Sequence, residues 1–283
     1  MIRPPSEADS IILQVTVGCS HNRCTFCGAY KDVRFRIKER KVIDADIDFA
    51  ATYCRRQNKV FLADGDVLIL PQKRLVPLLE KIRLRLPWVN RISLYANARS
   101  IMAKSPAELA ELKQLGLDRV YMGVESGSDT VLAAIRKGTD SAGMIRAGCR
   151  VRDAGLFLSV TVLLGIGGEA GSMEHAIATG RVVSDSGANQ IAALTIILLP
   201  NTPLYLAEKA KLFKIPDRNG LLRELRTMIT HISAPRVQFQ ANHASNYLPI
   251  SCRLSRDKEK ILTMIDAALV DGTALRPEHL RAL

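Results

Sequence analysis

Residues 12–27 read ILQVTVGCSHNRCTFC, a run of strand-forming residues followed at once by three closely spaced cysteines. The run is apolar and partly β-branched, as is typical of a strand buried in a parallel sheet. Gly18 separates it from the loop that carries Cys19, Cys24 and Cys27. Three thiols in a loop directly after a strand indicate a metal or redox site at the carboxyl end of a sheet.

Similar runs recur along the chain about every 30 residues, which is the period of βα units. The strand-like runs are 12–17, 60–64, 91–97, 119–125, 157–165 and 190–200. The amphipathic segments between them, expected to be helical, are 44–57, 72–85, 106–115, 128–154 and 172–187. Six βα units in series predict an α/β fold, a partial (β/α)6-type barrel like a TIM barrel. A doubly wound parallel sheet is the alternative.

The pattern changes after Pro203. The sequence predicts helices over 204–216 and 219–232, a seventh strand over 236–241 and a last helix over 255–270. No linker-like segment separates this tail from what precedes it. We therefore expect one structural domain with a barrel core over 1–203 and a C-terminal extension over 204–283 that covers the barrel mouth.

The bulk properties restrict the location and the partners. No apolar run is long enough for a transmembrane helix, and the polar N-terminus has no signal core. We expect a cytoplasmic protein with reduced thiols and no membrane partner. The formal charge is +12, and residues 31–41 hold six basic residues against two acidic ones. That segment is either a solvated basic face or a surface for an anionic partner.

The number of thiols distinguishes between metals. A structural zinc site closes on four ligands, and only His21 stands near enough in the sequence to complete one. Cys54, Cys149 and Cys252 stand apart and are expected to be small buried hydrophobic residues. Three thiolates suit a [4Fe–4S] cluster that leaves one iron open to another ligand.

Together with motifs at later strand ends, the cysteine loop resembles that of the radical S-adenosylmethionine (radical SAM) superfamily. Phe26 precedes the third cysteine, and the other motifs are ADGD (63–66), GVESGSD (123–129) and LLGIGGE (163–169). The resemblance covers about residues 11–203. The family's usual pattern has one residue fewer between its first two cysteines, so this chain carries a Cys-x4-Cys-x2-Cys variant.

The resemblance implies that Cys19, Cys24 and Cys27 hold three irons of a [4Fe–4S] cluster and that S-adenosylmethionine chelates the fourth. The reduced cluster would cleave the sulfonium to a 5′-deoxyadenosyl radical, which abstracts hydrogen from a substrate. By the same resemblance, we expect contacts to these cofactors from Phe26, Asp64, Gly65, Asp66, Asn97, Glu125, Lys137, Leu164, Gly165 and Ile166. No residue is predicted as a catalytic acid, base or nucleophile.

Four of these side chains are expected to contact charged or polar groups of the nucleotide. The resemblance places Asp64 and Asp66 near the methionyl amine, Glu125 at the ribose and Lys137 at the methionyl carboxylate. Each has a structural alternative: turn residues for the aspartates, a helix cap for Glu125, and a solvated helix-end cation for Lys137. The backbone of 164–166 would flank the adenine.

The segment NHASNYLP (242–249) is the most polar part of the tail. It is expected either to line a substrate pocket over the barrel mouth or to form a capping loop. The candidate substrate residues are Asn242, His243, Asn246 and Tyr247.

Three function classes follow from these patterns. The first is a radical SAM enzyme with an unidentified substrate, for which the basic chain favours an anionic one, and with an electron donor such as flavodoxin or ferredoxin. RNA is a less favoured alternative as its substrate. The second is a zinc-binding, nucleic-acid-associated protein, and the third is an iron–sulfur electron carrier.

Overall fold

The computed structural model describes residues 3–272 and 275–282. The strands are β1 (Ile11–Gln14), β2 (Thr16–Val17), β3 (Arg36–Ile37), β4 (Lys59–Ala63), β5 (Arg91–Ala96), β6 (Leu117–Glu125), β7 (Phe157–Leu164), β8 (Gln190–Thr195), β9 (Gln238–Gln240) and β10 (Ser251–Arg253). The α-helices are α1 (Arg40–Tyr53), α2 (Gln72–Arg85), α3 (Ala98–Met102), α4 (Pro106–Gln114), α5 (Asp129–Ala134), α6 (Ser141–Asp153), α7 (Gly168–Asp185), α8 (Pro203–Lys209), α9 (Arg218–Thr230) and α10 (Leu254–Asp271). Short 3-10 helices cover Pro5–Glu7 and Glu278–Leu280.

Eight of the strands form a mostly parallel sheet in the order β1-β4-β5-β6-β7-β8-β9-β10. The α/β class is therefore confirmed. The strand order follows the chain order, whereas a doubly wound sheet reverses it at a switch point, so the doubly wound alternative is wrong. The chain divides into two compact units: residues 1–22, 32–122 and 149–158, and residues 23–31, 123–148 and 159–283. The expected division of the chain at 203 stays a prediction.

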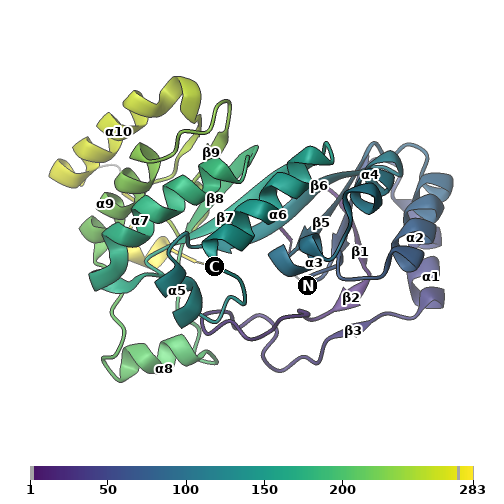
Figure 1. The fold of residues 1–283 in the computed structure, drawn as a ribbon, viewed down its shortest axis with the longest axis horizontal. Coiled ribbons are helices and arrows are strands. Elements are labelled where there is room, and N and C mark those ends of the chain that lie inside the picture. The colour runs from purple at the N-terminus through teal and green to yellow at the C-terminus, as the bar shows by residue number, and fades with distance from the viewer. Residues whose placement is uncertain (1–2, 273–274, 283) are drawn as a thin grey trace. The chain divides into compact units, whose positions relative to one another are not determined.

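The first unit contains β1, β4 and β5 as parallel neighbours, with Ile11 opposite Val60 and Val60 opposite Ile92. The run Val60–Ala63 is completely buried, which explains why β4 reads as continuously apolar. Helix α1 packs on β1 and against α2, and α2 also packs against α4 (Figure 1). Helix α4 begins with a capping box in which Ser105 Oγ accepts from the Glu108 N–H at 3.1 Å.

The second unit contains β7, β8 and β9 as parallel neighbours, and β10 runs antiparallel to β9. Strand β9 lies within the predicted seventh strand, and α10 matches the predicted last helix within a residue at each end. Both predictions are confirmed. Helix α7 packs along α9, and α9 packs against α10 (Figure 1). The buried apolar residues of α9 and α10 thus lie on the faces that pack within this unit.

Two predicted strands end early because their neighbours end. The run 12–17 leaves the main sheet after Gln14, whose partner Ala63 is the last residue of β4. Its remaining residues form β2, which pairs antiparallel with β3. The run 190–200 stops at Thr195, opposite Leu164, the last residue of β7.

The single helix expected over 128–154 is wrong, because the chain breaks it into α5 and α6. Helix α5 ends in a Schellman motif, in which the Lys137 and Arg136 N–H groups donate to the Leu132 and Ala133 carbonyls, each at 3.0 Å. Arg136 takes the left-handed position with φ 53°. Glycine usually occupies this position, so the sequence carries no clear stop signal.

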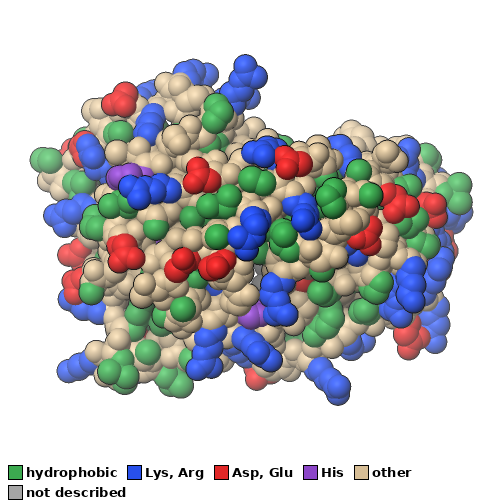
Figure 2. Space-filling view, in the orientation of Figure 1, with side chains coloured by type: hydrophobic (Ala, Val, Ile, Leu, Met, Phe, Trp, Pro, Cys, Tyr) green, Lys and Arg blue, Asp and Glu red, His purple; other side chains and the backbone are tan. Residues whose placement is uncertain are grey.

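Among the described helices, none is long and apolar enough to cross a membrane. On the face shown in Figure 2, basic side chains are interspersed with acidic and apolar ones.

Candidate functional site

In the first unit, the segment after β4 lies directly against the start of the cysteine loop. Asp64 is 2% exposed, and its Oδ2 accepts from Gln14 Nε2 at 3.0 Å and from the Gly18 N–H at 3.4 Å. A Cβ added to Gly65 would lie 3.0 Å from Cys19 Cβ and 3.1 Å from the Gly18 carbonyl oxygen. The segment therefore packs closely on the backbone at Gly18 and Cys19, and a side chain at position 65 would force this backbone to shift.

Asp66 is a fully buried carboxylate with an unused acceptor. Its Oδ2 accepts from Ser20 Oγ at 2.5 Å and from Asn97 Nδ2 at 2.7 Å. Its Oδ1 has no hydrogen-bond partner among the described residues. Burial raises the pKa of Asp66 to about 6, against the opposing effect of the Ser20 hydrogen bond. At neutral pH this carboxylate is mostly ionised, and an ammonium group would compensate its buried charge.

Asn97 positions Asp66 and begins α3. The Asn97 side chain accepts from the Ser100 N–H at 2.9 Å, and Ser100 Oγ accepts from the Asn97 N–H at 3.1 Å. Since the Asn97 amide also donates to Asp66, both of its polar atoms are engaged within the fold. A contact between Asn97 and the nucleotide stays a prediction.

In the second unit, Cys24 and Cys27 lie on a segment fastened by backbone hydrogen bonds. The Thr25 N–H donates to the Ile135 carbonyl at 3.0 Å, and the Leu204 N–H donates to the Thr25 carbonyl at 3.0 Å. Phe26 and both cysteines are half-buried. The ends of α5 and α8 thus hold the two thiols in place.

The chemistry of the donor set fits an iron–sulfur cluster. All six cysteines belong to the described part of the chain and are thiols, and those of the loop are partly exposed. Thiolate sulfur is the usual ligand of such clusters. No three His, Cys, Asp or Glu side chains within 3–272 and 275–282 are grouped as a metal site. The fit therefore rests on the kind and number of donor atoms and on the close packing of Gly65 against Gly18 and Cys19.

At the end of β6, Glu125 forms an ion pair with Lys137, whose Nζ lies 2.9 Å from Glu125 Oε1. The two side chains are only 11% and 12% exposed, so Lys137 is not a solvated cation. A Cβ on Gly123 would lie 2.1 Å from Glu125 Oε1 and 3.0 Å from Lys137 Nζ, so the pair lies directly against this glycine. Ser128, rather than Glu125, caps α5. Neither structural alternative considered for these two residues holds.

Leu164, Gly165 and Ile166 form the turn from β7 into α7. Leu164 and Ile166 are each 2% exposed, and Gly165 has φ 84°. The Gly165 N–H donates to Glu224 Oε1 at 2.6 Å. The structure thus shows which group fixes this turn, while its contact with adenine stays a prediction.

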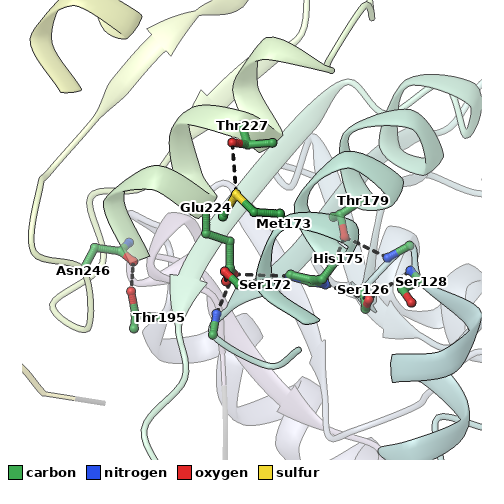
Figure 3. A network of polar contacts seen from close by, with 12 residues as sticks. Ser126, Ser128, Ser172, Met173, His175, Thr179, Thr195, Glu224, Thr227 and Asn246 are labelled. Atoms are coloured by element: carbon green, nitrogen blue, oxygen red, sulfur yellow. Dashed lines mark hydrogen bonds and ion pairs between the residues drawn. The ribbon is translucent and has the colours of Figure 1, made fainter. Parts of the chain in front are cut away.

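Sequence reasoning missed the polar network behind these turns, which is drawn in Figure 3. Glu224 and His175 are completely buried within it. A signal was present, because Glu224 falls on the apolar stripe of α9 with Leu221 and Met228. A charged residue in such a stripe indicates a buried partner.

The tail segment 242–249 is held mainly by contacts with other residues of the second unit. Asn246 is 1% exposed and donates to the Ala193 and Ala241 carbonyls, each at 2.8 Å. Tyr247 donates to Glu278, while His243 is half-buried and Asn242 is exposed. Burial and the Arg276 charge lower the pKa of His243. The contacts of Asn246 favour an anchoring role, and a substrate contact stays a prediction for all four residues.

Comparison with known proteins identifies the family. The profile of the radical SAM superfamily matches residues 13–178, which is more than half of the chain. A search of curated proteins finds no match to this sequence.

Three solved structures share the fold at low identity. Methylornithine synthase (PylB) is 16% identical with a TM-score of 0.56, over 80% of this chain and 63% of that protein. Coproporphyrinogen III oxidase (HemN) from Escherichia coli, a radical SAM enzyme, is 16% identical with a TM-score of 0.56, over 78% and 51%. The methyltransferase TsrM from Kitasatospora setae is 19% identical with a TM-score of 0.56, over 72% and 41%. This chain therefore spans less than two thirds of each of them.

These likenesses confirm the predicted partial-barrel fold. Members of the superfamily are enzymes that use a [4Fe–4S] cluster and S-adenosylmethionine, and they need a reductant and a substrate. The profile match includes the cysteine loop and the ends of β4, β5, β6 and β7. This chain belongs to the radical SAM superfamily.

Proposed function

We propose that the chain is an enzyme that binds a [4Fe–4S] cluster and S-adenosylmethionine and acts on a substrate still to be identified. The family match, which spans the cysteine loop and four later strand ends, carries this proposal. When bound, the two groups supply a 5′-deoxyadenosyl radical that abstracts hydrogen. The chain's own residues bind and orient them.

In this proposal Cys19, Cys24 and Cys27 supply three thiolates. Asp66 accepts from the methionyl ammonium through its unused Oδ1, and the neighbouring Asp64 supports the loop. Glu125 and Lys137 form a pair that exchanges partners: Lys137 moves to the methionyl carboxylate, and Glu125 becomes free to accept from the ribose hydroxyls. After the exchange, the Lys137 ammonium would pair with the methionyl carboxylate and the Glu125 carboxylate would accept hydrogen bonds from the hydroxyls, so neither buried group would lack a hydrogen-bond partner.

The specific partners belong to the proposal as well. The electron donor would be a flavodoxin or ferredoxin, and the location cytoplasmic. The charge of +12 favours an anionic substrate, with RNA as one option.

Anaerobic reconstitution of the whole chain tests the proposal. We expect about four irons and four sulfides per chain, and 5′-deoxyadenosine when S-adenosylmethionine and dithionite are added. A protein that holds only zinc and never takes up iron would support the nucleic-acid-associated alternative. A cluster that transfers electrons but never cleaves the nucleotide would support the electron carrier.

Alanine at position 65 is expected to weaken cluster binding. The new Cβ would press on Cys19 Cβ and the Gly18 carbonyl, neither of which is the far end of a flexible side chain. A change in the groups that support a metal ligand typically lowers the affinity for the metal by about 10- to 100-fold. We therefore expect Gly65→Ala to need at least about tenfold more iron for half-maximal reconstitution, followed by absorbance at the cluster band.

The matched control is Gly171→Ala in α7, where an added Cβ meets no atom within 4 Å. This variant should reconstitute like the wild type. If Gly65→Ala takes up iron like the wild type, the close packing at Gly65 does not support Cys19 as a cluster ligand.

A further inference from the structure

A buried polar network in the second unit contacts two of the candidate nucleotide-binding turns (Figure 3). Its side chains come from the end of β6, from α7 and from α9, and each is at most 5% exposed. We call it the Glu224 network, and its members are Ser126, Ser172, His175, Thr179 and Glu224. None of these residues belongs to the sequence motifs of the family described above, apart from Ser126, which directly follows Glu125.

Glu224 holds the turn after β7. Its Oε1 accepts from the Gly165 N–H at 2.6 Å, and its Oε2 accepts from Ser172 Oγ. A Cβ on Gly165 would lie 3.0 Å from Leu221 Cδ2, so this turn also packs directly on α9. A backbone N–H donated to a buried carboxylate is a strong, charge-assisted hydrogen bond. Without it, the Gly165 N–H and the Ser172 hydroxyl would lose their acceptor.

His175 holds the turn after β6. Its Nδ1 lies 2.7 Å from Ser126 Oγ, which itself accepts from the Ser128 N–H at 3.0 Å. Its Nε2 lies 3.4 Å from Glu224 Oε1. The nearby carboxylate favours a proton on Nε2, so that Nδ1 accepts from the Ser126 hydroxyl.

The turn after β6, residues 126–128, makes a second set of contacts with α7. The Gly127 N–H donates to Thr179 Oγ1 at 2.8 Å. A Cβ on Gly127 would lie 2.3 Å from the Ala178 carbonyl oxygen, so the backbone of this turn lies in close contact with the helix. Residues 126–128, which directly follow Glu125, are therefore held by both backbone and side-chain contacts.

We propose that Glu224 and His175 are positioning residues for S-adenosylmethionine, an inference that rests on the proposed function. The buried Glu224 fixes the turn that contains Gly165, and the neighbouring buried His175, whose Nε2 forms no hydrogen bond with any described residue, fixes the turn that follows Glu125. Glu125, which is expected at the ribose, directly precedes the first turn, and the second turn contains the residues expected at the adenine. Glu224 lies in the tail beyond residue 203, so the C-terminal extension is part of the nucleotide site rather than only a cover for it.

The test compares Glu224→Ala and Glu224→Gln in the full chain. Glutamine can still accept from Gly165 and donate to Ser172, whereas alanine leaves both unpaired. A hydrogen bond to a charged group contributes enough to change an equilibrium by about 10- to 100-fold. We expect Glu224→Ala to weaken S-adenosylmethionine binding to the reconstituted protein by about 10- to 100-fold, measured by anaerobic calorimetry. Glutamine should recover most of this loss.

A second readout needs no cluster. Hydrogen exchange of the Gly165 amide in the unreconstituted protein should be at least about tenfold faster in Glu224→Ala than in the wild type. The matched control is Arg226→Gln on the same helix, which removes an ion pair to Asp266 on α10 with an N–O distance of 2.5 Å. This control should change neither the exchange of Gly165 nor nucleotide binding. If Glu224→Ala does not fold, Glu224→Asp, whose shorter side chain withdraws the carboxylate from the Gly165 N–H, takes its place with the same readouts.

The outcomes separate this inference from the proposed function. If the wild type binds no S-adenosylmethionine, the proposed function fails and the inference fails with it. If the wild type binds it and a folded Glu224→Ala binds equally well, the inference alone is overturned. Lower thermal stability with unchanged Gly165 exchange and unchanged affinity would also overturn it, because that is the signature of a purely structural residue.

Discussion

Alanine at position 24 is expected to lower 5′-deoxyadenosine formation by more than about 100-fold. Groups that only support a metal ligand already contribute about 10- to 100-fold, so loss of a ligand itself should exceed that range. In the structure, the segment around Cys24 is fastened by the backbone of Thr25 to Ile135 and Leu204. A substitution of this side chain leaves those bonds intact, so the loss should be one of chemistry rather than of fold. The measurement is product formation per iron under dithionite.

Cys54→Ala is the control, because Cys54 is a half-buried thiol outside the cysteine loop, at the end of α1. This variant should retain iron content and product formation within about twofold of the wild type. Cys24→Ala that keeps a full cluster and wild-type product formation would contradict the assignment of Cys24 as a ligand. Loss of product in both variants would show that the assay reports stability instead.

Asp66→Asn is expected to remove a large pH dependence of stability. The pKa of Asp66 is raised to about 6 by burial, against a usual value of 3.8. The folded state therefore binds this proton more tightly than the unfolded state does. The contribution of Asp66 to stability is highest below about pH 4 and is lost as the pH rises from there through 6, when the buried carboxylate ionises. Two pKa units correspond to about 3 kcal/mol.

The measurement is the unfolding free energy of both proteins in urea at pH 4 and pH 7, without cluster. Most of this total falls between the two pH values, so the difference between the proteins should shift by about 2 kcal/mol in favour of the Asp66→Asn variant. Any constant cost of the new amide cancels in that shift. The control is Asp257→Asn: the hydrogen bond from Arg256 lowers the pKa of Asp257 to about 2, so the effect of that substitution should change little between pH 4 and pH 7. A flat difference for Asp66→Asn would show that Asp66 is not desolvated in the folded protein.

The parallel sheet could be predicted because strands buried on both faces must be apolar at every position. Val60–Ala63 is the clearest case, and the prediction and β4 agree within a residue. Strand ends could not be predicted in this way. Thr16 and Ile196 are as apolar or β-branched as their neighbours, and only the length of the adjacent strand ends the ladder before them. The break at Arg136 was also hidden, since a non-glycine residue takes the left-handed position.

The cysteine spacing and the polar residues at strand ends were sufficient to predict the family, because parallel strands bring their carboxyl ends to one edge of a sheet. Sequence alone therefore determined the class of fold and the family, and it predicted which cysteines supply the donors and which turns bind the nucleotide. Tertiary structure alone decided how the turn at Gly165 is held. Its anchor, Glu224, lies 59 residues further along the chain. A buried carboxylate is stable only where folding brings donors to it, and no local pattern specifies such donors across that separation.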